Sequence, residues 1–358
     1  MTEFYEHLRT PCKASSDSRI ESLKVLLLFS ALLTVFTGCN AGRTTSSMQP
    51  STSSSVALRA GPRIRPLTNR KFERTPARLA RGRYLVNGIG ECFACHGPSD
   101  SKRSGWPPIP GKEGSGEAGR YVAANLTPDR ETGAGYWTDD MLARAIREGV
   151  SHDGRLLDPT VMPYEFYWAM SDEDLASIIV YLRSIPAIRN PLPAPISTNH
   201  VVAPFAIPID APVPMPDLST PLKRGAYLVQ LGACQWCHTL RDQQTRHTLT
   251  GLEFAGGDLI NPNPFGQASS ANITPDPSGI SYYDEAFFLR VIHTGKVGAR
   301  KLNPVMPWWF FGHMSDADLK AIFAYLRTVK PVHHRVDNTE PITYCRICQQ
   351  KHHGGALN

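Results

Sequence analysis

The chain has 358 residues, which is long enough for two domains with flanking tails. Its hydrophobic fraction of 41% is that of an ordinary globular protein, so most of the chain is not expected to lie in a membrane. The formal charge of +6 is modest, and we expect no nucleic-acid partner.

Residues 1–38 have the features of an export signal. An apolar run from Val25 to Phe36 follows the basic residues Arg19 and Lys24, and it is too short to cross a bilayer as a helix. The run ends in Phe-Thr-Gly before Cys39, which resembles a bacterial lipoprotein box. We therefore predict a periplasmic protein anchored to a membrane through lipidated Cys39. Simple cleavage to a soluble periplasmic protein is the alternative.

Residues 39–75 are predicted to form a disordered tether. The segment is first rich in Ser and Thr and then rich in Arg, a composition that cannot bury enough apolar surface to fold alone. A solvated linker is the simpler interpretation. A basic arm that contacts anionic lipid headgroups or an acidic partner is the alternative.

The pentapeptide Cys-x-x-Cys-His occurs twice, at 92–96 and at 234–238. Two thiols three residues apart lie on one side of a helical turn, so both can bond to the vinyl groups along one edge of a haem. The next residue is then placed as an axial iron ligand. We predict two covalently bound haem c groups, attached through Cys92, Cys95, Cys234 and Cys237 and ligated by His96 and His238. A zinc or thiol-redox protein is a weaker alternative, because it does not need the adjacent histidine.

The surroundings of both motifs are also duplicated, which indicates a tandem repeat. Four blocks recur in the same order: Arg-Gly-x-Tyr-Leu-Val (81–86 and 224–229), Asn-[Leu/Ile]-Thr-Pro-Asp (125–129 and 272–276), Val-Met-Pro (161–163 and 305–307) and Met-Ser-Asp-x-Asp-Leu (170–175 and 314–319).

Each repeat is expected to contain three helices. The first runs over 77–87 or 221–231, the second over about 138–149 or 284–295, and the third follows a Ser-x-x-Asp capping box at Ser171 or Ser315. Gly82 and Gly225 lower helix propensity in the first helices. We therefore expect each to mark a close crossing with the last helix of its own repeat.

Two methionines in each repeat are candidates for the sixth iron ligand. Met170 and Met314 immediately precede a helix cap, where they are placed to form a hydrophobic staple. Met162 and Met306 precede a proline in an extended segment, so we predict that these two bind iron. The alternative, that they are ordinary core methionines, would leave both irons open. Filled axial positions favour electron transfer over oxygen or peroxide chemistry.

A backbone carbonyl near Pro98 is expected to accept the Nδ1–H of His96, and the second motif has no matching proline.

Two remaining segments have distinctive compositions. The proline density of residues 189–217 predicts an extended, semi-rigid linker. Near the C-terminus, Cys345-Arg346-Ile347-Cys348 has no adjacent histidine, and a local disulfide or a loose tail is the simplest interpretation. A weak metal site that uses His352 or His353 is the alternative.

Together these motifs resemble the c-type cytochrome subunits of bacterial membrane-bound alcohol, aldehyde and gluconate dehydrogenases. The resemblance covers about residues 77–332 and includes Phe-Ala-Gly-Gly at 254–257 and Asn-Pro-Phe-Gly at 263–266. It implies an all-α protein with two tandem class I cytochrome c domains, where the family typically has three. The expected division is a signal peptide (1–38), a tether (39–75), domain 1 (76–188), a linker (189–217), domain 2 (218–333) and a C-terminal tail (334–358).

The expected function is electron transfer on the periplasmic side of a membrane, between a dehydrogenase or the quinone pool and a terminal acceptor. Redox-partner proteins, a dehydrogenase or an oxidase, are implied by the resemblance. A dihaem enzyme of the peroxidase or thiosulfate-oxidising type is the alternative, and it requires an iron that is open or unusually ligated.

Overall fold

The computed structural model describes residues 63–97, 113–114, 121–192, 205–242, 247–260 and 267–353. The predicted signal peptide, Cys39, most of the tether, Pro98 and residues 261–266 lie outside the described residues. Within the described ranges, no helix combines the length and the apolar composition needed to cross a membrane.

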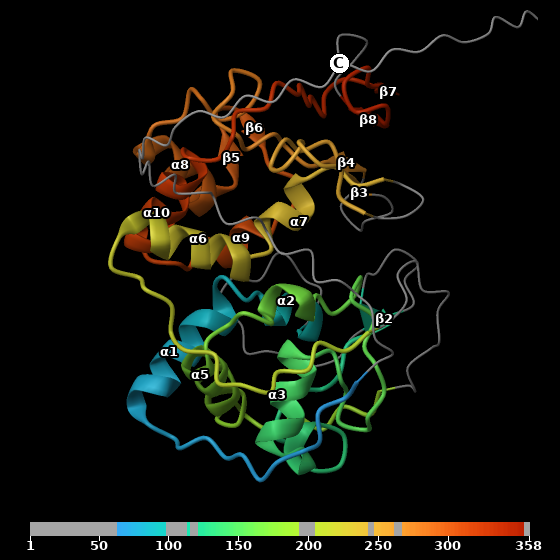
Figure 1. The fold of residues 1–358 in the computed structure, drawn as a ribbon, viewed down its shortest axis with the longest axis vertical. Helices are drawn as coiled ribbons and strands as arrows, with labels where there is room; N and C mark the ends of the chain where they lie inside the picture. Colours follow the sequence, from blue (N-terminus) through green and yellow to red (C-terminus); the bar gives the residue numbers. More distant parts are fainter. Residues whose placement is uncertain are drawn as a thin grey trace, which may run out of the picture. The chain divides into compact units, whose positions relative to one another are not determined.

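The described structure is mainly helical (Figure 1), in agreement with the predicted all-α class. The helices of the first repeat are α1 (Pro76–Asn87), α2 (Cys92–His96), α3 (Asp139–Arg147), α4 (Tyr164–Tyr167) and α5 (Asp172–Leu182). Those of the second repeat are α6 (Pro221–Leu231), α7 (Cys234–His238), α8 (Glu285–Thr294), α9 (Trp308–Phe311) and α10 (Asp316–Leu326). A short 3-10 helix, η1 (Ala134–Tyr136), precedes α3.

The strands within the described ranges are short and form four antiparallel pairs. They are β1 (Glu113–Gly114) with β2 (Tyr121–Val122), β3 (Leu259–Ile260) with β4 (Ala268–Ser269), β5 (Lys296–Val297) with β6 (Arg300–Lys301), and β7 (Ile342–Tyr344) with β8 (Lys351–His353). Strands of two or three residues brace loops and do not form a sheet layer of their own.

The three predicted helices per repeat are confirmed, and each starts at a side-chain cap. Thr75 and Thr220 cap α1 and α6 with proline at the first turn, and Ser171 and Ser315 cap α5 and α10. The one-turn helices α4 and α9, which directly follow the Met-Pro pairs, were not expected. A single turn of helix is too short to produce a detectable period.

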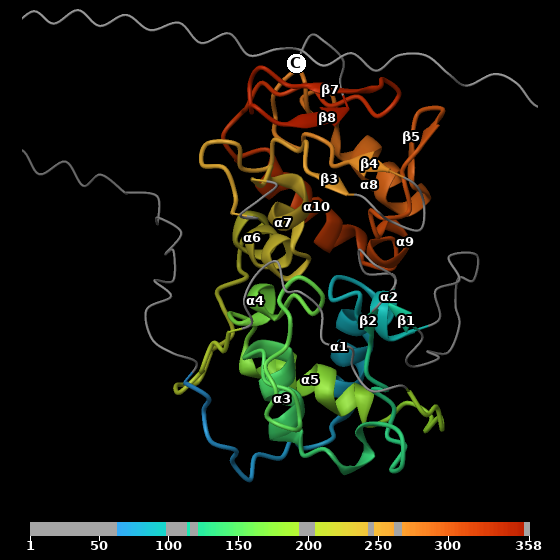
Figure 2. The same cartoon turned by 90° about the vertical axis from the view of Figure 1, so that its right-hand side faces the viewer.

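The two helix glycines mark close crossings, as predicted. A Cβ on Gly82 would lie 1.9 Å from the carbonyl oxygen of Ser177 in α5, and one on Gly225 would lie 2.0 Å from that of Ala321 in α10. Both crossings, α1 with α5 and α6 with α10, are visible in two views (Figures 1 and 2). The first and last helices of each repeat are therefore in backbone contact.

The predicted capping boxes are only half right. Ser171 and Ser315 accept hydrogen bonds from the backbone N–H groups of Asp174 and Asp318, as expected. The reciprocal half is replaced by a tyrosine, because the N–H of Ser171 donates to the hydroxyl of Tyr227 over 3.1 Å. That hydroxyl in turn donates to Asp174 Oδ2 over 2.8 Å.

The same contact occurs with the repeats exchanged. The N–H of Ser315 donates to the hydroxyl of Tyr84 over 3.0 Å, and that hydroxyl donates to Asp318. The tyrosine of each Gly-x-Tyr-Leu block therefore completes the cap of the last helix in the other repeat. One continuous hydrophobic cluster contains residues of both repeats, among them Leu85, Ile179, Leu228 and Ile322.

The end of the predicted tether is not solvated. Arg65, which the sequence interpretation placed in the disordered segment, is 7% exposed and contacts two carboxylates. Its guanidinium donates to Asp140 over 2.9 and 3.0 Å and to Glu148 over 2.9 Å. The prediction of a solvated segment rested on the basic composition alone. Composition does not reveal that one of these arginines pairs with buried acids in α3 and just after it.

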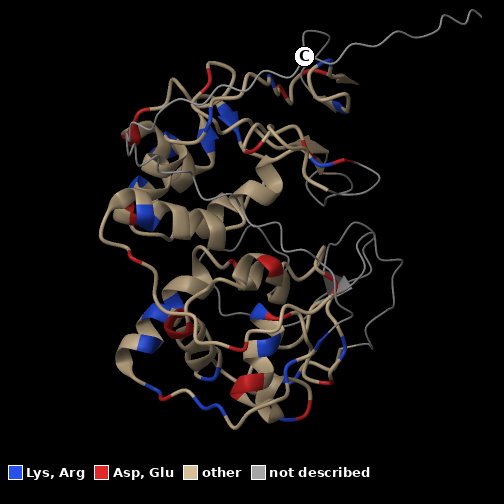
Figure 3. Ribbon diagram, in the orientation of Figure 1, with Lys and Arg blue, Asp and Glu red and all other residues tan. Residues whose placement is uncertain are grey.

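Of the predicted linker, residues 189–192 and 205–217 are described, and they contain no helix or strand. They also hydrogen-bond to the first repeat: the carbonyl of Phe205 accepts from Tyr164 over 2.7 Å, and the N–H of Val213 donates to Asp172 over 3.1 Å. Basic and acidic residues are interspersed along the described ribbon (Figure 3).

Replacing Arg65 tests how much the buried ion pair contributes to stability. Arg65→Met should lower the free energy of unfolding at pH 7 by about 3–5 kcal/mol, because it leaves two buried carboxylates without a partner. Burial alone would raise the pKa of Asp140, but hydrogen bonds from Arg65 and Thr68 outweigh it and hold the pKa below its usual range. The pair therefore stabilises the fold above the ordinary carboxyl pKa of about 3.9, and this contribution is lost as the pH falls through the depressed value.

Urea titrations of the purified protein from pH 7 down to about 3.5 measure this, and the difference from wild type should narrow at the acid end. Arg63→Met is the matched control, because Arg63 pairs with Asp210 at the surface, and it should cost less than about 1 kcal/mol. Equal losses for the two variants would contradict a special role for Arg65.

Replacing the exchanged tyrosines tests the contact between repeats. Tyr84→Phe and Tyr227→Phe should each lower the free energy of unfolding by about 1–3 kcal/mol, since each leaves a helix-cap N–H and a buried carboxylate with one partner fewer. Tyr136→Phe, at a side chain that is 72% exposed, should change it by less than about 0.5 kcal/mol. If all three variants unfold at the same urea concentration, the exchanged caps do not stabilise the interface.

Candidate haem sites

The first Cys-x-x-Cys-His motif forms the single turn α2, which starts from an unusual backbone conformation. Glu91, just before it, has φ +37°, a left-handed geometry that costs a non-glycine residue about 1–2 kcal/mol. Phe93 is 1% exposed and fixes the turn to the core, whereas Cys92 and His96 are half-buried and Cys95 is exposed. Strain of this kind is typical of a positioned functional turn.

The second motif, α7, has the same backbone conformation as α2, but different side chains pack it against its surroundings. Ala233 has φ +49° in the position of Glu91, and the N–H of Trp236 donates to its carbonyl over 2.9 Å. The residue after the first cysteine is now Gln235, which is exposed. Trp236 packs instead, under the guanidinium of Arg241 at 4.1 Å and edge-on to Phe166 of the first repeat at 6.0 Å.

Both motif histidines are oriented by a backbone carbonyl. Nδ1 of His96 lies 2.8 Å from the carbonyl oxygen of Ala124, and Nδ1 of His238 lies 2.7 Å from that of Ala271. A carbonyl only accepts, so Nδ1 carries the hydrogen and Nε2 of each neutral ring has a free lone pair. The acceptor near Pro98 was therefore predicted wrongly, and the two histidines have equivalent partners.

The recurring Asn-[Leu/Ile]-Thr-Pro-Asp block explains how those carbonyls are held. Asn125 follows Ala124, and its side chain accepts from the N–H and hydroxyl of Thr127 and donates to the carbonyl of Ile188 over 2.8 Å. Asn272 and Thr274 repeat this after Ala271, with the carbonyl of Val332 as acceptor. Sequence reasoning used this block only as evidence of duplication, although its position in both repeats was the available signal.

The motif thiols do not have the electrostatics of a thiol-redox pair. Burial raises the pKa of the Cys92 thiol to about 12. It likewise raises the pKa of Cys234 and of Cys237 to about 12. Catalytic thiols in Cys-x-x-Cys pairs have lowered pKa values. Burial also lowers the pKa of His96 and of His238, which favours the neutral, metal-binding form of both rings.

The two kinds of methionine have different surroundings. Met170 and Met314 are 1% and 3% exposed and belong to the hydrophobic core, as a packing role requires. Met162 and Met306 are only half-buried and pack against the edge of that core. Each is followed by a proline and then by α4 or α9, so the two segments are equivalent.

The regions around the two motifs approach each other closely. A Cβ on Gly232, just before α7, would lie 2.6 Å from Cδ1 of Ile89, just before α2. Burial raises the pKa of Glu91 to about 8, and its charge also acts on Cys234 and Cys237 of the other motif.

The residues present fit covalent haem c at both motifs. Two cysteines share one helical turn, and the adjacent histidine has its Nδ1 hydrogen-bonded and its Nε2 lone pair available. These are the donors that c-type attachment requires.

No protein-family model matches the chain. It is 30% identical over 294 residues to the fructose dehydrogenase cytochrome subunit of Gluconobacter japonicus, which covers 76% of this chain and 57% of that protein. It is also 30% identical over 272 residues to the gluconate 2-dehydrogenase cytochrome c subunit of Pantoea cypripedii, which covers 71% of this chain and 60% of that subunit. The chain thus spans somewhat over half the length of these two relatives.

A third relative is covered more completely. The chain is 28% identical over 255 residues to a diheme cytochrome c-type protein of Cereibacter sphaeroides, which covers 68% of this chain and 83% of that protein. The duplicated motifs, the equivalent geometry of their histidines and these similarities point to the same class of protein. The chain resembles a dihaem c-type cytochrome that is similar to the cytochrome c subunits of bacterial fructose, gluconate and alcohol dehydrogenases.

Proposed function

We propose that this protein is a dihaem electron carrier without substrate chemistry of its own. It consists of two tandem class I cytochrome c domains, residues 76–188 and 218–333, joined by the linker 189–217. The observation that carries the proposal is the exact equivalence of the two histidines, each on a strained one-turn helix and each donating Nδ1–H to an alanine carbonyl.

The chain's residues would hold the two groups in the same way. Cys92 and Cys95 form the thioether bonds of the first site, and Cys234 and Cys237 those of the second. His96 and His238 would each supply Nε2 to the iron. Met162 and Met306 would each supply a thioether sulfur to the same iron. Haem c, when bound, provides an iron that alternates between the ferric and ferrous states.

This ligand set supports transfer of electrons and not turnover of a substrate. A methionine thioether opposite histidine raises the reduction potential and leaves no open axial position. The half-buried environment of Met162 and Met306, compared with the buried Met170 and Met314, supports their assignment. The close approach of Ile89 to Gly232 supports transfer between the two sites within one chain.

The partners are inferred from the relatives. Two of those described above are cytochrome subunits of dehydrogenases. We therefore place this carrier between a dehydrogenase or the quinone pool and a terminal acceptor, on the periplasmic side of a membrane. Purification from native membranes with the haems intact should recover a dehydrogenase or an oxidase that reduces or oxidises it.

Removing one methionine at a time tests the ligand assignment. The oxidised protein should show a far-red charge-transfer band from thioether to iron. Met162→Ala and Met306→Ala should each reduce it to about half, and the double variant should abolish it, because each removes one of two such ligands. The reduction potential of the affected site should also fall.

Met170→Leu and Met314→Leu are the matched controls, because they keep the core volume and should leave the band unchanged. A high-spin iron in the resting wild-type protein, or turnover of peroxide or thiosulfate by it, would instead favour the dihaem enzyme.

The membrane anchor is tested separately. Cys39→Ser should move the protein from the membrane fraction to the soluble periplasmic fraction without changing its haem content, because it removes the residue that would carry the lipid. Immunoblots of fractionated cells and labelling with a fatty-acid analogue measure this. A variant that stays on the membrane would show that another contact holds it there.

A further inference from the structure

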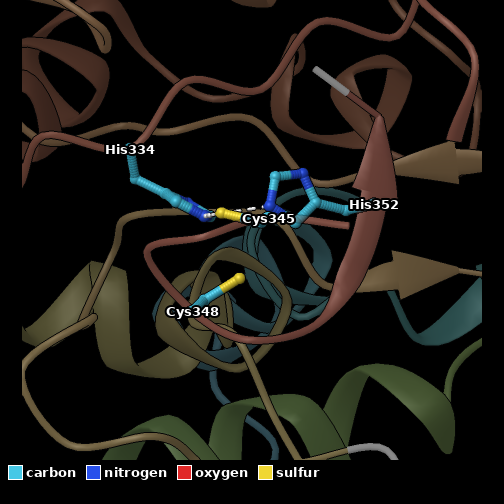
Figure 4. Close-up of side chains that lie close together, drawn as sticks. All are labelled: His334, Cys345, Cys348 and His352. Carbon is cyan, nitrogen blue, oxygen red and sulfur yellow. Dashed lines mark hydrogen bonds between the residues drawn. The ribbon is translucent and has the colours of Figure 1, made fainter. Parts of the chain in front are cut away.

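Four buried side chains from the segment after α10 lie close together, and they take no part in the proposed electron transfer. They are His334, Cys345, Cys348 and His352, which are between 0% and 5% exposed. One possible ligand atom from each lies within 4.8 Å of all the others. Figure 4 shows the two imidazoles and the two sulfur atoms pointing toward one another.

This arrangement corrects the sequence interpretation of the C-terminal Cys-x-x-Cys. A loose tail would leave both cysteines exposed, but they pack against Leu240, Leu249 and Leu252. The two thiols are also free and not joined in a disulfide. The alternative kept from the sequence, a metal site that uses His352 or His353, included His352 of this cluster. His334 was missed because it lies eleven residues before Cys345, outside any recognisable metal-binding spacing.

The hairpin β7–β8 positions three of the four side chains. The N–H of Cys345 donates to the carbonyl of Gln350 over 2.8 Å, which closes the turn between the strands. Within this turn Gln349 has φ +60°, a left-handed conformation that a non-glycine residue adopts at a cost. The turn returns Cys348 to the side of Cys345, and β8 then adds His352.

The hydrogen bonds of the two histidines fix which ring nitrogens face the cluster. Nδ1 of His334 lies 2.9 Å from the carbonyl of Ala255, and Nδ1 of His352 lies 2.6 Å from the carbonyl of His353. Because a carbonyl only accepts, both Nδ1 atoms carry the hydrogen and the neutral rings have lone pairs at Nε2. Backbone carbonyls orient metal-binding histidines in the same way.

These two lone pairs face each other. The Nε2 atoms are 3.1 Å apart, and Cys345 Sγ lies 3.5 Å from Nε2 of His334. Two acceptors at this distance repel unless a hydrogen or a cation lies between them, and a hydrogen there would place a buried positive charge on one ring. A cation bound by all four atoms removes the repulsion.

We propose that His334, Cys345, Cys348 and His352 bind one Zn²⁺ ion as a closed, tetrahedral structural site. Zinc bonds of about 2.0–2.3 Å give tetrahedron edges of roughly 3.3–3.8 Å, close to the nitrogen–nitrogen and sulfur–nitrogen distances found here. The widest separation between two of the four ligand atoms, which is at most 4.8 Å, must shorten when the ion binds to complete the tetrahedron. On binding, the two thiols release their protons to solvent, and the two thiolates balance the charge of the ion.

The ligand types select zinc over other ions. Two thiolates with two imidazoles suit Zn²⁺, whereas Mg²⁺ and Ca²⁺ prefer oxygen. Four protein ligands leave no position for water or substrate, which is the pattern of a structural site and not a catalytic one.

The site would stabilise the surroundings of the second haem motif. Ala255, the partner of His334, is followed by Gly256, whose N–H donates to the carbonyl of His238 over 2.8 Å. Gly257 makes room for the His334 ring, because a Cβ there would lie 2.5 Å from its Cε1. A hairpin of three-residue strands is marginal alone, so a metal that joins it to this loop contributes directly to folding.

Metal analysis of the full-length haem-containing protein tests the proposal. Elemental analysis by mass spectrometry should find about one zinc per chain in addition to the haem iron, and His334→Ala and Cys348→Ser should lower the zinc content to near zero. His333→Ala is the matched control: the His333 side chain, next in sequence to His334, is 75% exposed and contacts Asp276, so this variant should retain the zinc.

X-ray absorption at the zinc edge of the wild-type protein provides a second readout that needs no variant. It should show two sulfur ligands at about 2.3 Å and two nitrogen ligands at about 2.0 Å. After removal of the metal by a chelator, added zinc sulfate should restore one equivalent. The proposal is wrong if a peptide with a Cys345–Cys348 disulfide dominates the non-reduced digest, or if His334→Ala keeps its zinc.

Discussion

The exchanged tyrosine caps are the contact on which the arrangement of the two repeats depends. Tyr227 completes the N-terminal cap of α5, and Tyr84 completes that of α10. Each hydroxyl also donates to the aspartate of that cap, which is already paired with an arginine of its own repeat, Arg81 or Arg224. A buried carboxylate needs several donors, and neither repeat supplies all of them alone. These contacts hold α1 and α6 against the capped helix of the other repeat. The hydrophobic cluster therefore contains residues of both repeats.

This exchange also accounts for the relation between the two haem motifs. Each motif follows the helix that carries the exchanged tyrosine, so fixing that helix also fixes the loop that leads into the motif. The close approach of Ile89 to Gly232 and the edge contact of Phe166 with Trp236 are results of that geometry. Within each repeat, the Asn-Thr hydrogen bonds hold the segment whose alanine carbonyl orients the histidine. The residues that surround each motif therefore position the imidazole as much as the pentapeptide does.

The C-terminal cluster of His334, Cys345, Cys348 and His352 lies outside the duplicated part of the chain, and it also connects to the loops around a haem motif. His334 lies in the non-helical segment that follows α10, and the carbonyl of Val332, two residues earlier, accepts from Asn272. A metal at His334, Cys345, Cys348 and His352 would therefore brace the same loops that hold His238. In the first repeat, the carbonyl of Ile188 accepts from Asn125 in the equivalent way. The first repeat has no such cluster among its described residues, but Arg65 pairs there with Asp140 and Glu148 of the α3 region.

The sequence by itself determined what depends on local spacing. The haem motifs, the helix starts at Thr and Ser caps and the core positions of Met170 and Met314 follow from residue type and period, because they involve neighbours one or two turns apart. Glycine inside a helix also predicted the crossings at Gly82 and Gly225, although the sequence did not identify the backbone partners, Ser177 and Ala321. Only the tertiary structure decided what depends on distant partners. Tyr84 and Asp318, Arg65 and Asp140, and His334 and Cys345 meet because the folded backbone brings them together. Buried polar groups must find partners, but no sequence pattern states from which part of the chain those partners come.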